Sequence, residues 1–266
     1  MRFKDKFDNI VKKNNSLLCI GLDPEMEKLP RCLTELKNCV FDFNKNIIDL
    51  THDLVCAYKP NIAFYEAMGL TGLEQLKKTI DYLHEKYPEI PIILDAKRGD
   101  IGHTSAAYAR YVFDYLKADA VTLHPYLGKD ALQPFLDRKD KGCIILCRTS
   151  NPGAGEFQDL KFRNVPLYEI IARKVAANWN KNKNCLLVVG ATYPQELAKV
   201  RRIAGDMTFL VPGIGAQGGD IKKTVIAGMN SKKAGMIINS SRAIIFAENP
   251  REETRKLRDQ INNFRK

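Results

Sequence analysis

The amino-acid sequence predicts an α/β fold, a single (β/α)8 TIM barrel, and three observations support this prediction. The chain has 266 residues, and a barrel of this kind typically takes about 250. Eight short apolar runs alternate with stretches of helical periodicity, which is typical of a parallel sheet. No linker, internal repeat or low-complexity segment divides the chain. We therefore expect residues 1–266 to form one domain.

The predicted elements follow one another as strand and helix. A short amphipathic helix over 1–13 comes first, and a charged helix over 250–266 comes last. Each predicted strand is a short apolar run of the kind that a parallel sheet buries on both faces. The strands are placed at 17–24, 57–66, a run that starts at 91, 120–125, 142–149, 186–192, 208–215 and 235–242.

Periodicity and proline positions place the helices between these strands. Apolar residues recur at helical spacing through 72–87, and Pro194 stands at a favoured first-turn position. Pro60 removes a ladder donor, so we expect the pairing of the second strand to break there. Further helices are expected at 33–54, 105–117 and 165–181.

The net charge of +11 is high, but the Lys and Arg residues are spread along the chain. No arginine-rich run, aromatic RNA-binding strand or zinc-finger spacing occurs, so we do not expect nucleic acid as a partner. A solvated basic surface is the simpler interpretation. A positive field would also attract a phosphorylated small molecule.

The cysteines, histidines and N-terminus predict a reduced, cytoplasmic protein. The seven cysteines are odd in number, form no CxxC and lie mostly in apolar runs, as expected of buried thiols. The four scattered histidines argue against a zinc site, and we expect no metal. The segment Met1–Lys6 lacks the apolar core of a signal peptide. No apolar run is long enough to span a bilayer, so we expect no contact with a membrane.

The strand that starts at 91 leads into a highly charged segment, Asp95-Ala96-Lys97-Arg98-Gly99-Asp100. Side chains alternate along a strand, so Asp95 and Lys97 are expected on the same face. Opposite charges at the end of a buried strand are costly unless they serve each other or a ligand. One interpretation is a structural ion pair, with Asp100 capping the next helix. We favour an active site, because barrel sites lie at strand ends. An ammonium between two carboxylates suits a proton donor, or a site that repels an anionic substrate group.

Other polar side chains also follow the predicted strands, at the point where each strand ends. Barrel active sites lie at this carboxyl face, so these side chains are expected to converge there. Their convergence is more informative than any one of them. The candidates are Asp23, Lys59, Asn61, Asp95, Lys97, Thr149, Ser150 and Arg242.

A glycine-rich segment, Gly213-Ile214-Gly215-Ala216-Gln217-Gly218, follows the seventh strand and matches GxGxxG. A dinucleotide site would need an acidic residue about twenty positions later, and no acid lies between Asp220 and Glu248. The motif also lies in the seventh βα unit rather than the first. We favour a phosphate site, because the loops after barrel strands seven and eight often bind phosphate. Arg242 would add a charged contact.

Taken in order, these motifs resemble those of the orotidine 5′-monophosphate decarboxylase family, in particular its bacterial subgroup. The resemblance runs from about Leu17 to Ala243, nearly the whole chain. The Asp-x-Lys-x-x-Asp pattern alone is less specific, because related barrels share it. The matching segments are Gly21-Leu22-Asp23-Pro24, Lys59-Pro60-Asn61-x-x-Phe64-x-Glu66, Asp95 to Thr104, Arg148-Thr149-Ser150-Asn151-Pro152, Val211 to Gly219 and Ser241-Arg242.

The resemblance implies conversion of orotidine 5′-monophosphate (OMP) to UMP and CO2, the last step of de novo pyrimidine synthesis. It also implies that the enzyme needs no metal or organic cofactor and is a homodimer with its sites at the subunit interface. The charged tetrad of the family is matched by Lys59, Asp95, Lys97 and Asp100, with Lys97 as the proton donor. The residues expected to reach the partner's site are Asp100, Ile101 and Thr104.

The resemblance also assigns the substrate contacts. Asp23 and Asn61 match contacts on the ribose side, and Thr149 or Ser150 matches the pyrimidine contact. The remaining matches are Pro212 in the base pocket, Gln217 between base and phosphate, and Arg242 at the phosphate.

Two alternatives remain open. Related barrel enzymes that act on sugar phosphates, such as hexulose-phosphate synthase or ketogulonate-phosphate decarboxylase, share part of the motif and need Mg²⁺. A non-catalytic barrel that binds phosphate or nucleic acid would show salt-dependent binding to DNA or RNA. The charged residues around Lys97 favour the decarboxylase.

Overall fold

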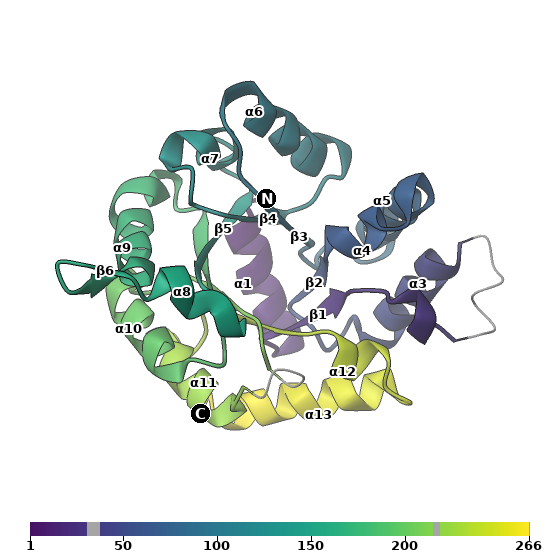
Figure 1. Ribbon diagram of the computed structural model, residues 1–266. Helices are drawn as coiled ribbons and strands as arrows, with labels where there is room; N and C mark the ends of the chain where they lie inside the picture. The colour runs from purple at the N-terminus through teal and green to yellow at the C-terminus, as the bar shows by residue number, and fades with distance from the viewer. Residues whose placement is uncertain (31–37, 215–218, 266) are drawn as a thin grey trace.

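The computed structural model describes residues 1–30, 38–214 and 219–265 and confirms the barrel (Figure 1). Its eight parallel strands lie in the order β2-β1-β10-β9-β8-β5-β4-β3. Parallel bridges between Tyr58 and Ile92 and between Asn61 and Asp95 join β2 to β3, so the sheet closes on itself. The strands are β1 (Leu18–Leu22), β2 (Ala57–Pro60), β3 (Ile93–Arg98), β4 (Ala120–Leu123), β5 (Gly142–Arg148), β8 (Cys185–Val189), β9 (Phe209–Val211) and β10 (Met236–Ser240).

Helices connect the strands and surround the barrel (Figure 1). Such crossovers are the usual connection between parallel strands. The longer helices are α1 (Phe3–Asn14), α3 (Cys39–Thr51), α5 (Gly69–Lys86), α6 (Gly102–Arg110), α7 (Lys129–Leu136), α9 (Leu167–Lys174), α10 (Pro194–Ala204), α11 (Ile221–Gly228) and α13 (Pro250–Asn263). The short helical segments are η1 (Met26–Lys28), α4 (Ile62–Glu66), η2 (Tyr111–Tyr115), η3 (Pro152–Ala154), α8 (Gly155–Gln158), η4 (Val175–Trp179), η5 (Asn180–Asn182) and α12 (Arg242–Ile245).

The core fills the barrel and the layer between the strands and the helices. Every residue of β1, β2, β4, β8 and β10 is buried, as expected of parallel strands covered on both faces. Helix α1 closes the amino end of the barrel with buried Phe3, Phe7 and Ile10. The Phe3 N–H donates to the carbonyl of Asp140, just before β5, at 2.7 Å. The carboxyl end of the barrel is left open for a site.

The second strand is shorter than the sequence predicts. It ends at Pro60, and 62–66 forms α4 instead. Asn61 is the reason, because its side-chain oxygen accepts a hydrogen bond from the Ala63 N–H at 3.2 Å and starts the helix.

The helices predicted at 105–117 and 165–181 each change from α to π geometry, in η2 and η4. The wider turn of η2 keeps Val112, Phe113 and Leu116 buried together. A small antiparallel hairpin, β6 (Lys161–Phe162) and β7 (Val165–Pro166), was not predicted. Such two-residue strands are too short to show a period of two.

Across the described ranges, we find no helix with both the length and the apolar character needed to cross a membrane.

Candidate active site

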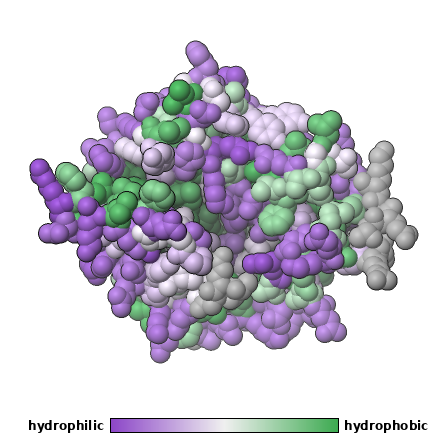
Figure 2. Space-filling view, viewed as in Figure 1, coloured by the Kyte–Doolittle hydropathy of each residue, from purple (hydrophilic) through white to green (hydrophobic). Residues whose placement is uncertain are grey.

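A cavity of about 580 Å³ opens at the carboxyl end of the barrel. Figure 2 shows the hollow near the centre of this face, between hydrophobic residues on one side and hydrophilic residues on the other. Side chains from the ends of different strands line it, because parallel strands in a barrel all end at the same rim. Those predicted from the sequence that line it are Asp23, Lys59, Asn61, Asp95, Lys97, Thr149, Ser150, Pro212 and Arg242.

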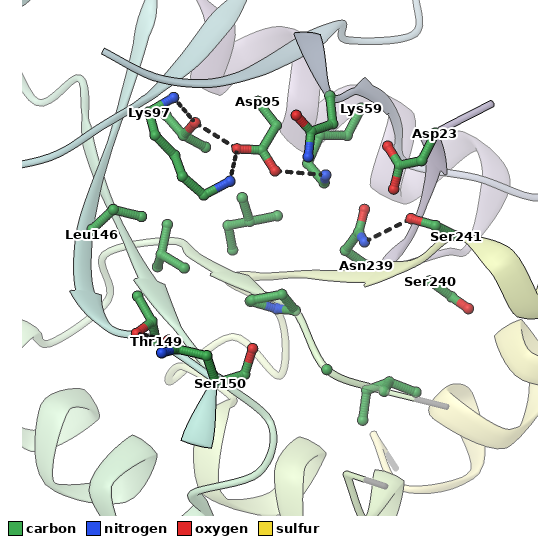
Figure 3. Close-up of a pocket in the computed structure, with 18 of the residues that line it drawn as sticks. Asp23, Lys59, Asp95, Lys97, Leu146, Thr149, Ser150, Asn239, Ser240 and Ser241 are labelled. Carbon is green, nitrogen blue, oxygen red and sulfur yellow. Dashed lines mark hydrogen bonds and ion pairs between the residues drawn. The ribbon is translucent and has the colours of Figure 1, made fainter. Parts of the chain in front are cut away.

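Two lysines and one aspartate form a chain of charges along one wall (Figure 3). Lys59 Nζ lies 3.0 Å from Asp95 Oδ2, and Lys97 Nζ lies 2.8 Å from Asp95 Oδ1. Lys59 is 4% exposed, whereas half of the Lys97 side chain is open to the cavity and solvent, with 51% exposed. Asp95 therefore holds a fixed ammonium on one oxygen and an accessible ammonium on the other.

The pKa values of the buried pair shift in the directions that keep both groups charged. Burial raises the pKa of the Asp95 carboxyl, but Lys59 and Lys97 lower it by more, so it lies well below its ordinary value. Burial lowers the pKa of Lys59, but Asp95 and Asp23 raise it by more, so it lies above its ordinary value. A buried ion pair of this kind stays charged only because each partner compensates the other.

The end of β3 does not alternate regularly, contrary to the sequence prediction. Lys97 has φ +46, in the left-handed region that side chains other than glycine rarely adopt. Pairing with β4 shifts register between Leu94 and Arg98. Arg98 fixes the far side of this irregular segment, because its guanidinium donates to the Ala96 carbonyl at 3.2 Å and pairs with Glu66 at 2.6 Å. The Lys97 and Asp95 side chains are in contact although β3 does not alternate regularly here.

On the other side of Lys59, the cavity wall presents buried polar atoms. Asp23 Oδ1 and Asn239 Oδ1 are both buried and accept no hydrogen bond from any described residue. The Asn239 amide donates to Ser241 Oγ at 3.3 Å, as Figure 3 shows. A Cβ atom at Gly21 would overlap the Ser241 hydroxyl, so the glycine allows β1 and the end of β10 to approach here. Buried acceptors without partners suit the hydroxyl groups of a ligand.

The opposite wall is held by the segment after β5. Gln158 accepts from the Thr149 N–H at 2.9 Å and donates to the Thr149 hydroxyl at 2.8 Å. Beneath it, Arg148 is 3% exposed and pairs with Asp159 at 3.1 Å. The Arg148 guanidinium lies 4.2 Å from the centre of the Tyr193 ring. The α8 segment is thereby attached to the end of β5.

Three predicted site residues of the described part of the chain do not line this cavity. Asp100 is half-buried, and its Oδ1 accepts from the Ile101 N–H at 2.7 Å. Ile101 and Thr104 are exposed at the start of α6. Gln217 lies outside the described residues.

Sequence reasoning did not select Thr122, Asn239 and Gln158, which all line the cavity. Asn239 is the first polar residue after the apolar run 236–238 of the predicted strand, and this could have identified it. Thr122 and Gln158 carried no comparable signal, because β-branched threonine is common in strands and Gln158 lies beyond a loop.

The glycine-rich segment belongs to the unit β9–α11 of the barrel and does not follow the first strand of a dinucleotide-binding sheet. Gly213 has φ +100, and a Cβ at Gly219 would lie 2.7 Å from the Gly213 carbonyl. Gly213 and Gly219 are therefore required by the backbone conformation of Gly213 and by the close approach of the two residues at the rim. Within the described ranges, no group of three His, Cys, Asp or Glu side chains suits a metal ion.

Comparison with known proteins identifies the family. The sequence model of the "Orotidine 5'-phosphate decarboxylase / HUMPS family" matches residues 16–257. The chain is 51% identical to an orotidine 5′-phosphate decarboxylase of Cellvibrio japonicus (strain Ueda107), over 98% of each protein. It is 49% identical to that of Ralstonia pickettii (strain 12J), over the full length of both.

Solved structures agree with the sequence relatives. The structure of Leishmania donovani OMP decarboxylase superimposes with a TM-score of 0.91 at 40% identity, over 100% of this chain and 99% of that chain. The structure of Leishmania donovani UMP synthase superimposes with a TM-score of 0.92 at 42% identity, over 100% of this chain and 57% of that chain. The family match spans most of the sequence, and full-length relatives share about half of its residues. This chain therefore belongs to the orotidine 5′-phosphate decarboxylase family.

Proposed function

We propose that this protein decarboxylates OMP to UMP, a step of pyrimidine biosynthesis, with Lys97 as the proton donor. The observation that carries the proposal is the Lys59–Asp95–Lys97 chain of charges in the cavity of a chain that belongs to this family. Lys97 carries the solvent-accessible ammonium of these three charged groups, and Asp95 holds it at the cavity wall.

The chemistry requires a cation where negative charge develops. When the bond between pyrimidine C6 and its carboxylate breaks, CO2 leaves and the electron pair stays on C6. The Lys97 ammonium stabilises this pair electrostatically and then transfers a proton from Nζ to C6, which gives UMP. Lys97 regains a proton from solvent, because half of its side chain is exposed. No electron-accepting cofactor enters this sequence of steps.

The neighbouring charges would orient the reacting groups. Asp95 would lie beside the departing carboxylate and hold Lys97 in place. Lys59 would keep Asp95 in one orientation, since it is buried and pairs with the other carboxylate oxygen.

The remaining cavity residues suit the other parts of a nucleotide. Asp23, whose buried Oδ1 accepts no hydrogen bond from the described residues, and Asn61 would bind the ribose hydroxyls. Thr149 or Ser150 would contact the pyrimidine, and Pro212 would pack against it. Arg242 and Gln217 would bind the phosphate, and this distant binding energy would be used at the transition state.

We also propose that the active form is a cytoplasmic homodimer. Asp100, Ile101 and Thr104 do not line the cavity of their own chain, and in a dimer they would complete the site of the partner subunit. The proposal needs no metal, no organic cofactor and no nucleic acid.

The test is the loss of ultraviolet absorbance when purified protein is mixed with OMP in the presence of EDTA. We expect the absorbance to fall at the same rate with and without the chelator. An unchanged absorbance would contradict the proposal. Turnover of a sugar phosphate that is abolished by EDTA would instead support the Mg²⁺-dependent barrel enzymes.

A further inference from the structure

The segment of β3 that carries Asp95 and Lys97 is bulged. Leu94 pairs with Val121, and the next pair joins Arg98 to Leu123. Three residues of β3 therefore lie opposite one residue of β4, Thr122. A bulge of this size leaves backbone groups of β3 without their usual ladder partners.

The Thr122 hydroxyl makes three hydrogen bonds to the bulged residues of β3. It accepts from the Ala96 N–H at 3.0 Å and from the Lys97 N–H at 2.9 Å. It donates to Asp95 Oδ1 at 2.8 Å, the same oxygen that binds Lys97 Nζ. Thr122 is 1% exposed, so water does not readily replace it. One oxygen atom thus fixes both the backbone of the proton donor and the carboxylate that orients it.

We propose that Thr122 is a positioning residue of the decarboxylation, acting through Asp95 and Lys97. This inference rests on the proposed function. Two accepted N–H groups use both acceptor sites of the hydroxyl, so its proton is directed to Asp95. Asp95 Oδ1 then receives Thr122 and Lys97, while Oδ2 receives Lys59. The carboxylate has one orientation, and Lys97 Nζ has one position relative to the substrate.

Replacing the Thr122 hydroxyl with a methyl group separates the effect of its hydrogen bonds from the effect of side-chain packing. Thr122→Val keeps the shape of the side chain but leaves the Ala96 and Lys97 N–H groups without their acceptor, which favours relaxation of the bulge. Thr122→Ser keeps the hydroxyl and loses only a methyl group. Displacement of a reacting group by about 1 Å costs up to about 100-fold in rate. The phosphate and ribose contacts would not change, so nucleotide affinity should be preserved.

The experiment compares wild type, T122V and T122S for kcat on OMP and for UMP affinity by calorimetry. We expect kcat of T122V to fall by about 10- to 100-fold with UMP affinity within about threefold of wild type, and T122S to stay near wild type. Thr254→Val is a matched control, because Thr254 is also buried and donates to a carbonyl, that of Pro250, on the distant helix α13. Should T122V fail to fold, T122A takes its place with the same expectation.

Two results would overturn the inference. One is T122V with kcat within threefold of wild type, and the other is T122S that loses as much activity as T122V, since only packing would then matter. Crystal structures of wild type and T122V give a readout independent of turnover. A displaced Lys97 supports the inference, and an unchanged contact between Lys97 and Asp95 contradicts it. Absence of OMP turnover in wild type would instead contradict the proposed function.

Discussion

Lys97 is the side chain whose removal should cost the most activity. It is the half-exposed ammonium of the charge chain, and it would supply both the stabilising charge and the proton. We expect Lys97→Ala to lower kcat by at least about 10³-fold, measured as OMP absorbance loss, while UMP still binds. Lys12→Ala, which removes an exposed lysine on α1 at the closed end of the barrel, is the control. Near wild-type turnover by folded Lys97→Ala would exclude this lysine as the acid.

Asp95 should contribute stability as well as orientation. Removing its charge leaves Lys59 buried without its partner, so Asp95→Asn should lower the free energy of unfolding at pH 7 by about 3 kcal/mol. The pKa of Asp95 is lower in the folded chain than its ordinary value of about 3.9. Its contribution is therefore complete above that value and is lost as pH falls towards the folded pKa. The difference in the free energy of unfolding between wild type and Asp95→Asn should be about 1 kcal/mol smaller at pH 3 than at pH 7.

Urea unfolding followed by circular dichroism at pH 7 and pH 3 measures this difference. Asp114→Asn is the comparison, because Asp114 pairs with Arg138 at the surface and should contribute less than about 1 kcal/mol. If Asp95→Asn lowers the free energy of unfolding equally at the two pH values, Asp95 has the same pKa in the folded and unfolded chain, which would contradict this prediction.

At the level of the element, strand positions were predictable and the distortions that build the site were not. A buried parallel strand such as β8 is a continuous apolar run, and its flanking polar residues mark the rim. Asp23, Lys59 and Asp95 were found in this way. The β3 bulge has no such signature, since Lys97 in the left-handed region reads like any strand residue. The conformation of the bulge depends on hydrogen bonds with Thr122 of β4, and the local sequence of β3 does not indicate these bonds.

The α8 segment should influence substrate binding more than chemistry. Gln158 makes two hydrogen bonds to Thr149, one to its N–H and one to its hydroxyl, and joins α8 to the cavity wall. Gln158→Ala would leave the Thr149 hydroxyl with its bond to Asn151 but without Gln158, and the proposed function places Thr149 beside the pyrimidine. We expect KM for OMP to rise by about tenfold, as loss of one or two hydrogen bonds implies, with a smaller change in kcat. The control is Gln195→Ala at an exposed position of α10. A fall in kcat at unchanged KM would contradict this division of roles.

At the level of the whole molecule, the face beside the cavity suits a second copy of the chain. Ile101, Tyr126 and Leu127 are 61%, 87% and 43% exposed, on the loops after the adjacent strands β3 and β4. Exposed apolar side chains on neighbouring loops are of the kind that interaction sites bury. Asp100 lies beside them, outside its own cavity. An isologous dimer through this face would bring Asp100 of each chain towards the other site.

Mixed dimers test this arrangement, because each site would take Lys97 from one subunit and Asp100 from the other. Lys97→Ala and Asp100→Ala homodimers should both be inactive, whereas each heterodimer has one site in which both residues are intact. A one-to-one mixture that exchanges freely should recover about a quarter of wild-type kcat. Lys97→Ala mixed with Lys59→Ala is the matched control, since both lysines line the same cavity and no heterodimer site would be intact. Recovery in the control, or none with Asp100→Ala, would show that Asp100 does not serve the partner's site.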